Sequence, residues 1–534
     1  MQTSIEIAQK SHPLQITEIA KRVGLRPEEI EPHGPHKAKV SLDVLTRLGQ
    51  RPNGKLIVVT AMTPTKQGEG KTCTSIVLTQ ALAKLGKRSM VCIRQPSLAP
   101  TFGVKGGGTG GGFAQLLPME DINLHFTGDI HAVEYAHNLL ASIIGNHIFR
   151  GNALDLDTER ILWRRVIDVP DRELRSLFDI TASSEIMAIL ALSHDLKDLS
   201  RRLSRIVVGF NRSGKPVTVA DLHLEGSLTL ILRDASRPNL VQTLEGQGAF
   251  VHTGPYANVA HGNSSVIATQ IALKLVNYVV TESGFGSDLG LEKFFDIVCR
   301  QAHFKPDAVV LVCSVKALRS QGDPKKDDSS SLKEGLANLK RHIENIQKFG
   351  MKPIVTVNRF SDDKEWEIGE VKAYVHYIGA PVVVSEGYTK GSKGAMELAE
   401  KVLQLVQENG NRFKFLYPLT LSLREKIETL ARFYGAKGVQ VTKEADTALT
   451  HLSGLGFEGL PINMAKTHLS FSDDPTVKGA PADWTLHVKD LRIAAGAGFV
   501  NCIAGNMLLL PGLPEEPIAQ KITIDDAGKI KGLF

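Results

Sequence analysis

The segment TPTKQGEGKT, which ends at Thr72, has the residue types and spacing of a phosphate-binding loop. Such a loop works because backbone N–H groups and the start of the following helix point at phosphate oxygens. Gly68 and Gly70 allow the tight backbone, and Lys71 would neutralise the β- and γ-phosphates. The Thr72 hydroxyl would contact Mg²⁺. The usual opening glycine is replaced by Thr65, but a predicted strand before the loop and a helix after it favour a nucleotide site over a chance Gly-Lys-Thr.

A second loop, RQPSLAPTFGVKGGGTGGG, begins at Arg94 directly after the next predicted strand. In an open α/β sheet, ligands bind at the carboxyl ends of the strands, so we expect Arg94 to lie where the first loop also opens. A guanidinium there can bind a phosphate or a small carboxylate through two hydrogen bonds. Six of the seven residues from Gly106 to Gly112 are glycine, which lets the backbone approach a ligand closely. This composition predicts a ligand-binding loop rather than a flexible linker.

A third segment, PMEDINLHFTGDIHA, gathers carboxylates and histidines that could bind a metal ion. They are Glu120, Asp121, His125, Asp129 and His131. The two histidines do not have the i, i+4 spacing that would place both on one face of a helix. We therefore favour hydrogen bonds that hold the loop over direct metal ligation.

Polar residues also lie near the ends of two other predicted strands. Glu282 and Asp288 could contact Mg²⁺ through water or form salt bridges. Asn358 could read the edge of a nucleotide base or serve as a turn residue. The residue types alone leave these alternatives open.

The elements that must position these loops follow from apolar periodicity. It predicts strands over 56–62 and 89–93 and, between them, a helix over 71–85, which is one βαβ unit. Further short apolar runs predict strands at 278–280, 308–312, 354–357 and 382–384. The pattern is typical of an α/β fold: a major domain with a P-loop-type, doubly wound, mostly parallel sheet, and two smaller α/β domains. We place the domains at residues 1–345, 346–450 and 451–534, and the last ends in a hairpin that turns near residues 526–528.

Composition excludes several classes of protein. The formal charge of +6 over 534 residues is spread along the chain, without a basic block that would indicate a nucleic-acid partner. No run of eighteen apolar residues predicts a membrane span, and the first residues lack the apolar stretch of a secretory signal. Five scattered cysteines, without a C-x-x-C pair, predict reduced packing thiols in a cytoplasmic protein.

The longer motifs PTKQGEGKT, RQPSLAPTFGVKGG and PMEDINLHFTGDIHAV resemble those of the formate–tetrahydrofolate ligase family. The resemblance continues through HTGPYANVAHG, TESGFGSDLGLEKFFDI, MAKTHLSFSDD, LRIAAGAGF and the terminal GKIKGLF. It covers essentially the whole chain in order. The phosphate loop without its first glycine is itself a feature of that family.

The resemblance implies a reaction and its partners. ATP, formate and tetrahydrofolate would give 10-formyltetrahydrofolate, ADP and phosphate through formyl phosphate. It also implies Mg²⁺, a monovalent cation (K⁺ or NH₄⁺) and a homo-oligomer, tetrameric or dimeric. Small molecules are the only other partners it implies.

The resemblance also assigns roles to individual residues. Lys71 would bind phosphate, Arg94 would bind formyl phosphate, and Gln95 and Ser97 would line that site; these four form the catalytic set. The family's folate slot uses a Phe, a Pro and a Trp, and the matching positions here hold Phe285, Ser361 and Tyr388. The full set for nucleotide and folate is Thr63, Thr65, Gly68, Glu69, Gly70, Lys71, Thr72, Phe285, Ser361 and Tyr388, with Thr72 also the expected metal ligand.

The chain departs from the family pattern at several points. A glycine-rich loop of roughly fifteen residues that usually follows Leu177 is absent, and the connection at residues 322–324 is shortened. Ser361 cannot form an apolar wall, whereas Tyr388 can still stack on a flat ring. Two alternatives therefore stay open beside the ligase: a paralogue that binds nucleotide but has lost folate ligation and serves a regulatory or assembly role, and a P-loop enzyme that activates another small carboxylate.

Overall fold

The computed structural model describes residues 2–65, 68–103, 108–323, 325–408, 412–507, 509–526 and 528–533. Within them, the largest sheet has twelve strands. Its strands are β1 (Ile30–Pro32), β2 (Ala38–Val40), β3 (Lys55–Ala61), β4 (Ser89–Ile93), β5 (Gly110–Gly111), β6 (Ala114–Leu117), β12 (Asn239–Thr243), β13 (Gly248–Val251), β14 (Tyr278–Gly286), β15 (Ala308–Cys313), β16 (Pro353–Asn358) and β17 (Val382–Ser385). All six strands predicted from the apolar runs are present in this sheet.

The strand order along the main path is β1-β2-β12-β13-β4-β14-β3-β15-β16-β17, and β6 pairs with β12 and β5 off this path. All pairs from β13 to β17 are parallel. The pairs that involve β1, β2, β5 and β6, and the pair β12–β13, are antiparallel. The predicted α/β class with a mostly parallel main sheet is therefore confirmed.

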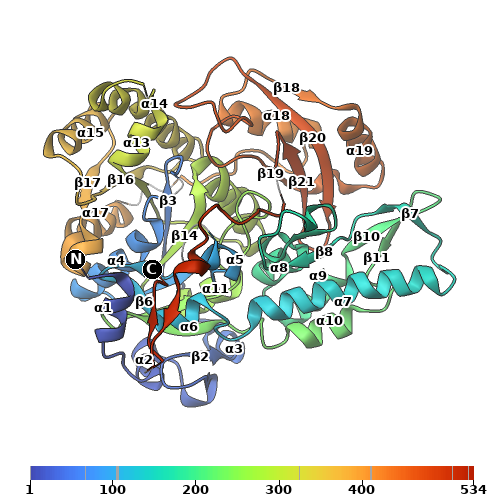
Figure 1. Cartoon of the computed structure of the whole chain (residues 1–534), viewed down its shortest axis with the longest axis horizontal. Coiled ribbons are helices and arrows are strands. Elements are labelled where there is room, and N and C mark those ends of the chain that lie inside the picture. The colour runs from blue at the N-terminus through green and yellow to red at the C-terminus, as the bar shows by residue number, and fades with distance from the viewer. Residues whose placement is uncertain are drawn as a thin grey trace.

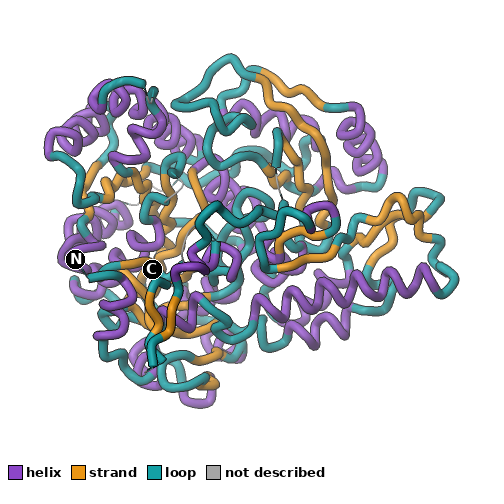
Figure 2. Tube along the Cα trace, viewed as in Figure 1, coloured by secondary structure: helices purple, strands orange, loops and turns teal. Residues whose placement is uncertain are grey.

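Helices surround this sheet, and Figure 2 shows them on the outside of its strands. They are α1 (Ser4–Lys10), α2 (Ile16–Val23), α3 (Asp43–Leu48), α4 (Lys71–Lys84), α5 (Leu98–Phe102), α6 (Met119–Asn123), α11 (Val266–Leu275), α12 (Arg300–Ala302), α13 (Val315–Gln321), α14 (Asp328–Lys348), α15 (Glu365–Tyr377), α16 (Gly387–Lys390) and α17 (Met396–Gln407), with two π-helical segments, η4 (Ser287–Leu291) and η5 (Phe294–Cys299). No helix in the described part of the chain is long and apolar enough to cross a lipid bilayer.

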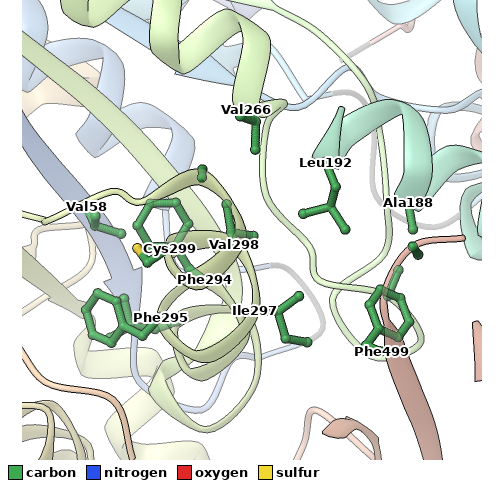
Figure 3. Packing of buried hydrophobic residues seen from close by; sticks show 14 of the residues in the cluster. Val58, Ala188, Leu192, Val266, Phe294, Phe295, Ile297, Val298, Cys299 and Phe499 are labelled. Carbon is green, nitrogen blue, oxygen red and sulfur yellow. The ribbon is translucent and has the colours of Figure 1, made fainter. Parts of the chain in front are cut away.

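Both faces of the sheet are buried because the central strands are apolar on both sides. Leu56 and Val58 of β3 belong to one core, with residues of α11, α14 and η5. Ile57 and Val59 belong to the other, with residues of α4 and α17. Figure 3 shows part of the first core, where the aromatic rings of η5 lie against β3 and the side chains of α8 (Glu185–Leu192) approach Phe499.

Two groups of elements flank the main sheet (Figure 1). One extends to the side and consists of α7 (Asp129–Phe149), α8, α9 (Leu196–Ser204), α10 (Glu225–Leu232), the sheet of β7 (Leu156–Ile161), β10 (Val207–Asn211) and β11 (Pro216–Thr218), and the pair β8 (Arg165–Ile167) and β9 (Phe178–Ile180). The other consists of α18 (Leu423–Tyr434), α19 (Lys443–Gly454) and the sheet β18 (Gly438–Val441), β20 (Thr485–Ala494), β21 (Phe499–Ala504) and β19 (Ile462–Ala465). Near the C-terminus β22 (Thr523–Ile524) pairs antiparallel with β23 (Ile530–Lys531), as the predicted hairpin requires, and residue 527 of its turn lies outside the described residues.

The predicted domain boundaries stay predictions. The main sheet continues across the boundary at residue 345, because β16 and β17 pair in parallel with β15 and with each other. The C-terminal sheet likewise uses strands on both sides of residue 450, since β18 pairs with β20. Which strands share a sheet depends on the strand order, and apolar runs in the sequence do not specify that order.

The stretch 319–331 is charged and rich in serine, yet both of its ends are helical. Helix α13 continues to Gln321, and α14 begins at Asp328. The side chain of Asp327 accepts hydrogen bonds from the backbone N–H groups of Ser329 and Ser330, which caps α14. Serines that favour loops elsewhere therefore form the first turn of a capped helix here.

Three buried histidines make the stability of this fold depend on pH. Burial lowers the pKa of His137, His252 and His342 to about 4 each. In the unfolded chain the same imidazoles bind a proton at a higher pH. The contribution of the neutral, buried imidazoles to stability is therefore complete above pH ~6.5 and is lost as pH falls toward 4. We expect the free energy of unfolding, measured by urea titration, to fall by about 2 kcal/mol for each histidine between pH 7 and pH 5.

In the variant His252→Gln the replaced side chain cannot be protonated. Between pH 7 and pH 5 the free energy of unfolding of this variant should therefore fall by about 2 kcal/mol less than that of the wild type. His376, which is exposed on α15, provides the control, because His376→Gln should leave the pH dependence as it is. An equal change in free energy of unfolding between pH 7 and pH 5 for His252→Gln and the wild type would contradict this account.

Candidate functional site

The base of the phosphate loop is fixed by a buried histidine. After β3 ends at Ala61, the backbone N–H of Thr63 donates to Nε2 of His342 at 2.7 Å. Nε2 is therefore an acceptor, and Nδ1–H of the same ring donates to Oγ of Ser287 at 2.7 Å. The Thr63 hydroxyl also accepts from Nδ2 of Asn338 at 3.0 Å. Helix α14 and segment η4 thus hold the start of the loop.

Hydrogen bonds within the loop explain why the first glycine of the usual pattern is dispensable. Thr65 keeps a negative φ, so its side chain causes no backbone strain. Its N–H donates to Oε1 of Glu69 at 2.7 Å. The Glu69 carboxylate also accepts from the hydroxyl of Ser314, and its backbone oxygen accepts from Nδ2 of Asn358 at 3.2 Å. Glu69 therefore closes the loop and ties it to the ends of β15 and β16.

Gly70 is required where the loop enters α4. Its φ is +81°, and a Cβ placed there would lie 2.3 Å from Nδ2 of Asn358. We expect Gly70→Ala to weaken binding of ATP or ADP by about tenfold or more, since a strained backbone costs on the order of 1–3 kcal/mol. Titration calorimetry with ADP measures this. Gly86→Ala is a matched control, because Gly86 also has a positive φ, +73°, but open space around it; equal affinities of the two variants would contradict the prediction.

Glu282 joins the two loops. Its Oε2 accepts a hydrogen bond from the hydroxyl of Thr72 at 2.7 Å, and its Oε1 lies 3.8 Å from Nη2 of Arg94. The arrangement follows from strand order, because β14 lies between β3 and β4 and pairs in parallel with both. Nη1 of Arg94 donates to the carbonyl oxygen of Pro255 at 3.2 Å, while its buried Nε has no hydrogen-bond partner among the residues that the structure describes. The guanidinium of Arg94 is thus held in place and keeps an N–H group that can donate to a ligand.

The residues after Arg94 form a second cluster. Ser97 precedes α5, and its hydroxyl lies 3.2 Å from the hydroxyl of Tyr256. Oδ2 of Asp168 accepts from the backbone N–H of Leu98 at 2.8 Å, and burial raises the pKa of Asp168 to about 6. The backbone N–H of Gln95 donates to the carbonyl oxygen of Thr253 at 2.7 Å. Tyr256 lies within the quoted motif HTGPYANVAHG, whereas no sequence pattern marks Asp168.

A cavity of about 170 Å³ lies beside this cluster, and Gln95 and Asp168 help to line it. Oε1 of Gln95 and Oδ1 of Asp168 are buried, and neither has a hydrogen-bond partner in the described part of the chain. The stacked imidazole rings of His125 and His131, whose centroids lie 5.7 Å apart, form another part of the lining of this cavity. Acceptors orphaned in this way, on two residues that line one cavity, favour a donor or a cation as a ligand there.

The acidic residues of PMEDINLHFTGDIHA are used in ion pairs. Asp121 pairs with Lys37, and Asp129 pairs with the buried Lys39; both N–O distances are 2.6 Å. Glu120 accepts from the side chain of Gln9 at 2.7 Å. These contacts hold the segment against α1 and against the chain at and just before β2, in agreement with the favoured interpretation.

The three residues matched to a folate slot contact different segments. Phe285 stacks on His468, and Ser361 is exposed after β16. Tyr388 packs on the glycine-rich segment, where its backbone oxygen accepts from the N–H of Phe113 at 2.9 Å. Their common role stays a prediction. Gly106 and Gly107 of the predicted glycine run lie outside the described residues.

A comparison with known protein families identifies the family of the whole chain. A family model described as formate–tetrahydrofolate ligase matches residues 2–534. The chain belongs to the formate–tetrahydrofolate ligase family. Such ligases are ATP-dependent and join formate to tetrahydrofolate. The match includes Leu177 and residues 322–324, where the sequence was expected to depart from the family pattern.

Proposed function

We propose that this ligase converts ATP, formate and tetrahydrofolate into 10-formyltetrahydrofolate, ADP and phosphate through formyl phosphate. The observation that carries the proposal is the position of Glu282, which contacts Thr72 of the phosphate loop and faces Arg94 of the second loop. Residues of the two loops thus meet across β14, which lies between β3 and β4. Transfer of a phosphoryl group to a carboxylate needs this proximity.

In the first step a formate oxygen attacks the γ-phosphorus of ATP, and the bond from that phosphorus to the ADP oxygen breaks. Charge on the transferred group is spread over its outer oxygens, so positioned cations lower the barrier. Lys71 at the start of α4 and Arg94 at the end of β4 supply this charge. Gly68, Gly70 and the backbone of the loop hold the remaining phosphates.

In the second step N10 of tetrahydrofolate attacks the formyl carbon. The bond from this carbon to the bridging oxygen breaks, and phosphate leaves with that oxygen and accepts the proton released from N10. The hydroxyls of Ser97 and Tyr256, 3.2 Å apart, can donate to the oxygens of the mixed anhydride. Asp168 holds the start of α5 and so positions Ser97.

The residues also fit the expected ions. The Thr72 hydroxyl and the Glu282 carboxylate are oxygen donors of the kind that Mg²⁺ prefers, and Mg²⁺ when bound would offset phosphate charge. The orphaned oxygens of Gln95 and Asp168 suit K⁺ or NH₄⁺.

We assign the remaining predicted residues to the two larger substrates. Thr63, Thr65 and Glu69 shape the loop that binds ATP, with the hydrogen bonds described above. Phe285, Ser361 and Tyr388 would border the pterin of tetrahydrofolate, and Phe285 and Tyr388 offer rings for stacking.

The proposal is tested by product formation and by substrate choice. With ATP, formate and tetrahydrofolate, we expect 10-formyltetrahydrofolate, read as its acid-generated methenyl derivative. Replacing formate by acetate or bicarbonate should abolish ADP release that depends on the acid. Faster ADP release with either replacement would favour an enzyme for another carboxylate. ATP binding without folate binding or product would favour the paralogue without ligase activity.

We also propose a homo-oligomer, tetrameric or dimeric, in the cytoplasm. All five cysteines are unpaired thiols, and four of them are buried, which suits a reducing compartment. Sedimentation velocity of the purified chain tests the oligomer, and a monomer at all concentrations would contradict it.

A further inference from the structure

The imidazole ring of His468 stacks on the phenyl ring of Phe285. The ring centroids lie 4.3 Å apart, and the ring planes differ by 19°. Both side chains are partly exposed. An aromatic ring has two faces, and His468 covers one face of Phe285. A flat ligand can therefore stack only on the opposite face of Phe285.

A buried ion pair fixes this stack. Nζ of Lys466 lies 2.6 Å from Oδ2 of Asp288, and the two side chains are 0% and 4% exposed. The same Nζ donates to the carbonyl oxygen of Ser470 at 2.7 Å. Lys466 and Ser470 flank His468 in the chain, and Asp288 follows Phe285 closely. The ion pair thus holds the segment after β19 against the end of β14.

The backbone places Phe285 between the two loops that bind the smaller substrates. Its φ is +58°, a value that a bulky residue adopts only where the surroundings enforce it. A Cβ at Gly284 would lie 3.2 Å from Nη1 of Arg94, and one at Gly286 would lie 2.8 Å from Cε1 of His342. The glycines on either side of Phe285 therefore lie close to Arg94 and to the histidine that anchors the phosphate loop.

We propose that His468 is a positioning residue for tetrahydrofolate. It covers one face of Phe285 and holds the phenyl plane, so that the pterin stacks on the other face with N10 directed toward the acid activated near Arg94. This inference rests on the proposed function. It makes the C-terminal sheet a contributor to the active site, because His468 follows β19 in the chain.

Steady-state kinetics of three variants tests the role of His468. His468→Ala should raise KM for tetrahydrofolate about tenfold and leave KM for ATP and for formate within about twofold, since only the pterin wall changes. His468→Phe retains a ring and should stay within about threefold of the wild type for tetrahydrofolate. His451→Ala is the matched control, because the ring of His451 also contacts a phenylalanine. This is Phe210 of β10, and the two ring centroids lie 4.7 Å apart.

An unchanged KM for tetrahydrofolate in His468→Ala would overturn the inference. So would an equal rise in KM for all three substrates, or an equal effect of His468→Ala and His468→Phe. If the wild type forms no product, the proposed function fails, and folate binding measured by fluorescence titration still decides this inference. Binding about tenfold weaker in His468→Ala then supports it, and equal binding overturns it.

Discussion

Replacing Lys71 by alanine should lower kcat for formation of 10-formyltetrahydrofolate by about 10³-fold. The ammonium group at the start of α4 offsets charge on the phosphates, and a lost contact of this kind costs on the order of 3–4 kcal/mol in the transition state. The measurement is the rate of product formation at saturating formate and tetrahydrofolate. The loss should persist when ATP is raised, because the interaction matters most while the phosphoryl group is transferred.

Lys84→Ala is the control for this variant. Lys84 lies in the last turn of the same helix, and its side chain is 59% exposed. Its Nζ lies 3.8 Å from Oε2 of Glu245. It should keep the wild-type rate and fold equally well. A Lys71→Ala enzyme with more than about a tenth of the wild-type kcat would remove the phosphate loop from the mechanism.

Replacing Arg94 by lysine should lower kcat/KM for formate by about 100-fold. Lysine keeps the charge but loses the planar fork, and with it the two parallel hydrogen bonds to a carboxylate or phosphate. The contact with Glu282 and the bond to Pro255 hold the guanidinium in place, so the effect arises at the ligand. Initial rates at varied formate measure it.

Arg212→Lys provides the matched comparison. Nη1 of Arg212 also lies near a carboxylate, 2.6 Å from Oδ1 of Asp155. The side chain of Arg212, however, is 69% exposed. This exchange should leave the kinetics unchanged. Equal effects of Arg94→Lys and Arg212→Lys would show that the guanidinium of Arg94 does not contact the reacting groups.

The local elements of the site can be predicted from the sequence, because short-range patterns specify them. The apolar run before residue 62 gives β3, and the helical spacing after Lys71 gives α4, which begins at that residue. The loop between them thus follows from neighbouring residues. Arg94 is similarly placed by the strand that precedes it, which ends at Ile93.

Contacts between distant segments could not be predicted in this way. Glu282 reaches Thr72 only because β14 lies beside β3, with Glu282 in register with Val59. Asp168 carries no local signal, and His468 lies within the quoted motif MAKTHLSFSDD, but the motif does not show that its ring meets Phe285. The same reason explains why β16 and β17 extend the main sheet across the predicted boundary at residue 345.

The fate of the formate oxygen tests the central claim most directly. The wild-type enzyme is supplied with ATP, tetrahydrofolate and formate labelled with ¹⁸O, and the released phosphate is analysed by mass spectrometry. If formate is first phosphorylated, one of its oxygens leaves with phosphate, and the account predicts one ¹⁸O atom in each phosphate formed with product. Unlabelled phosphate released alongside 10-formyltetrahydrofolate would contradict a route through formyl phosphate.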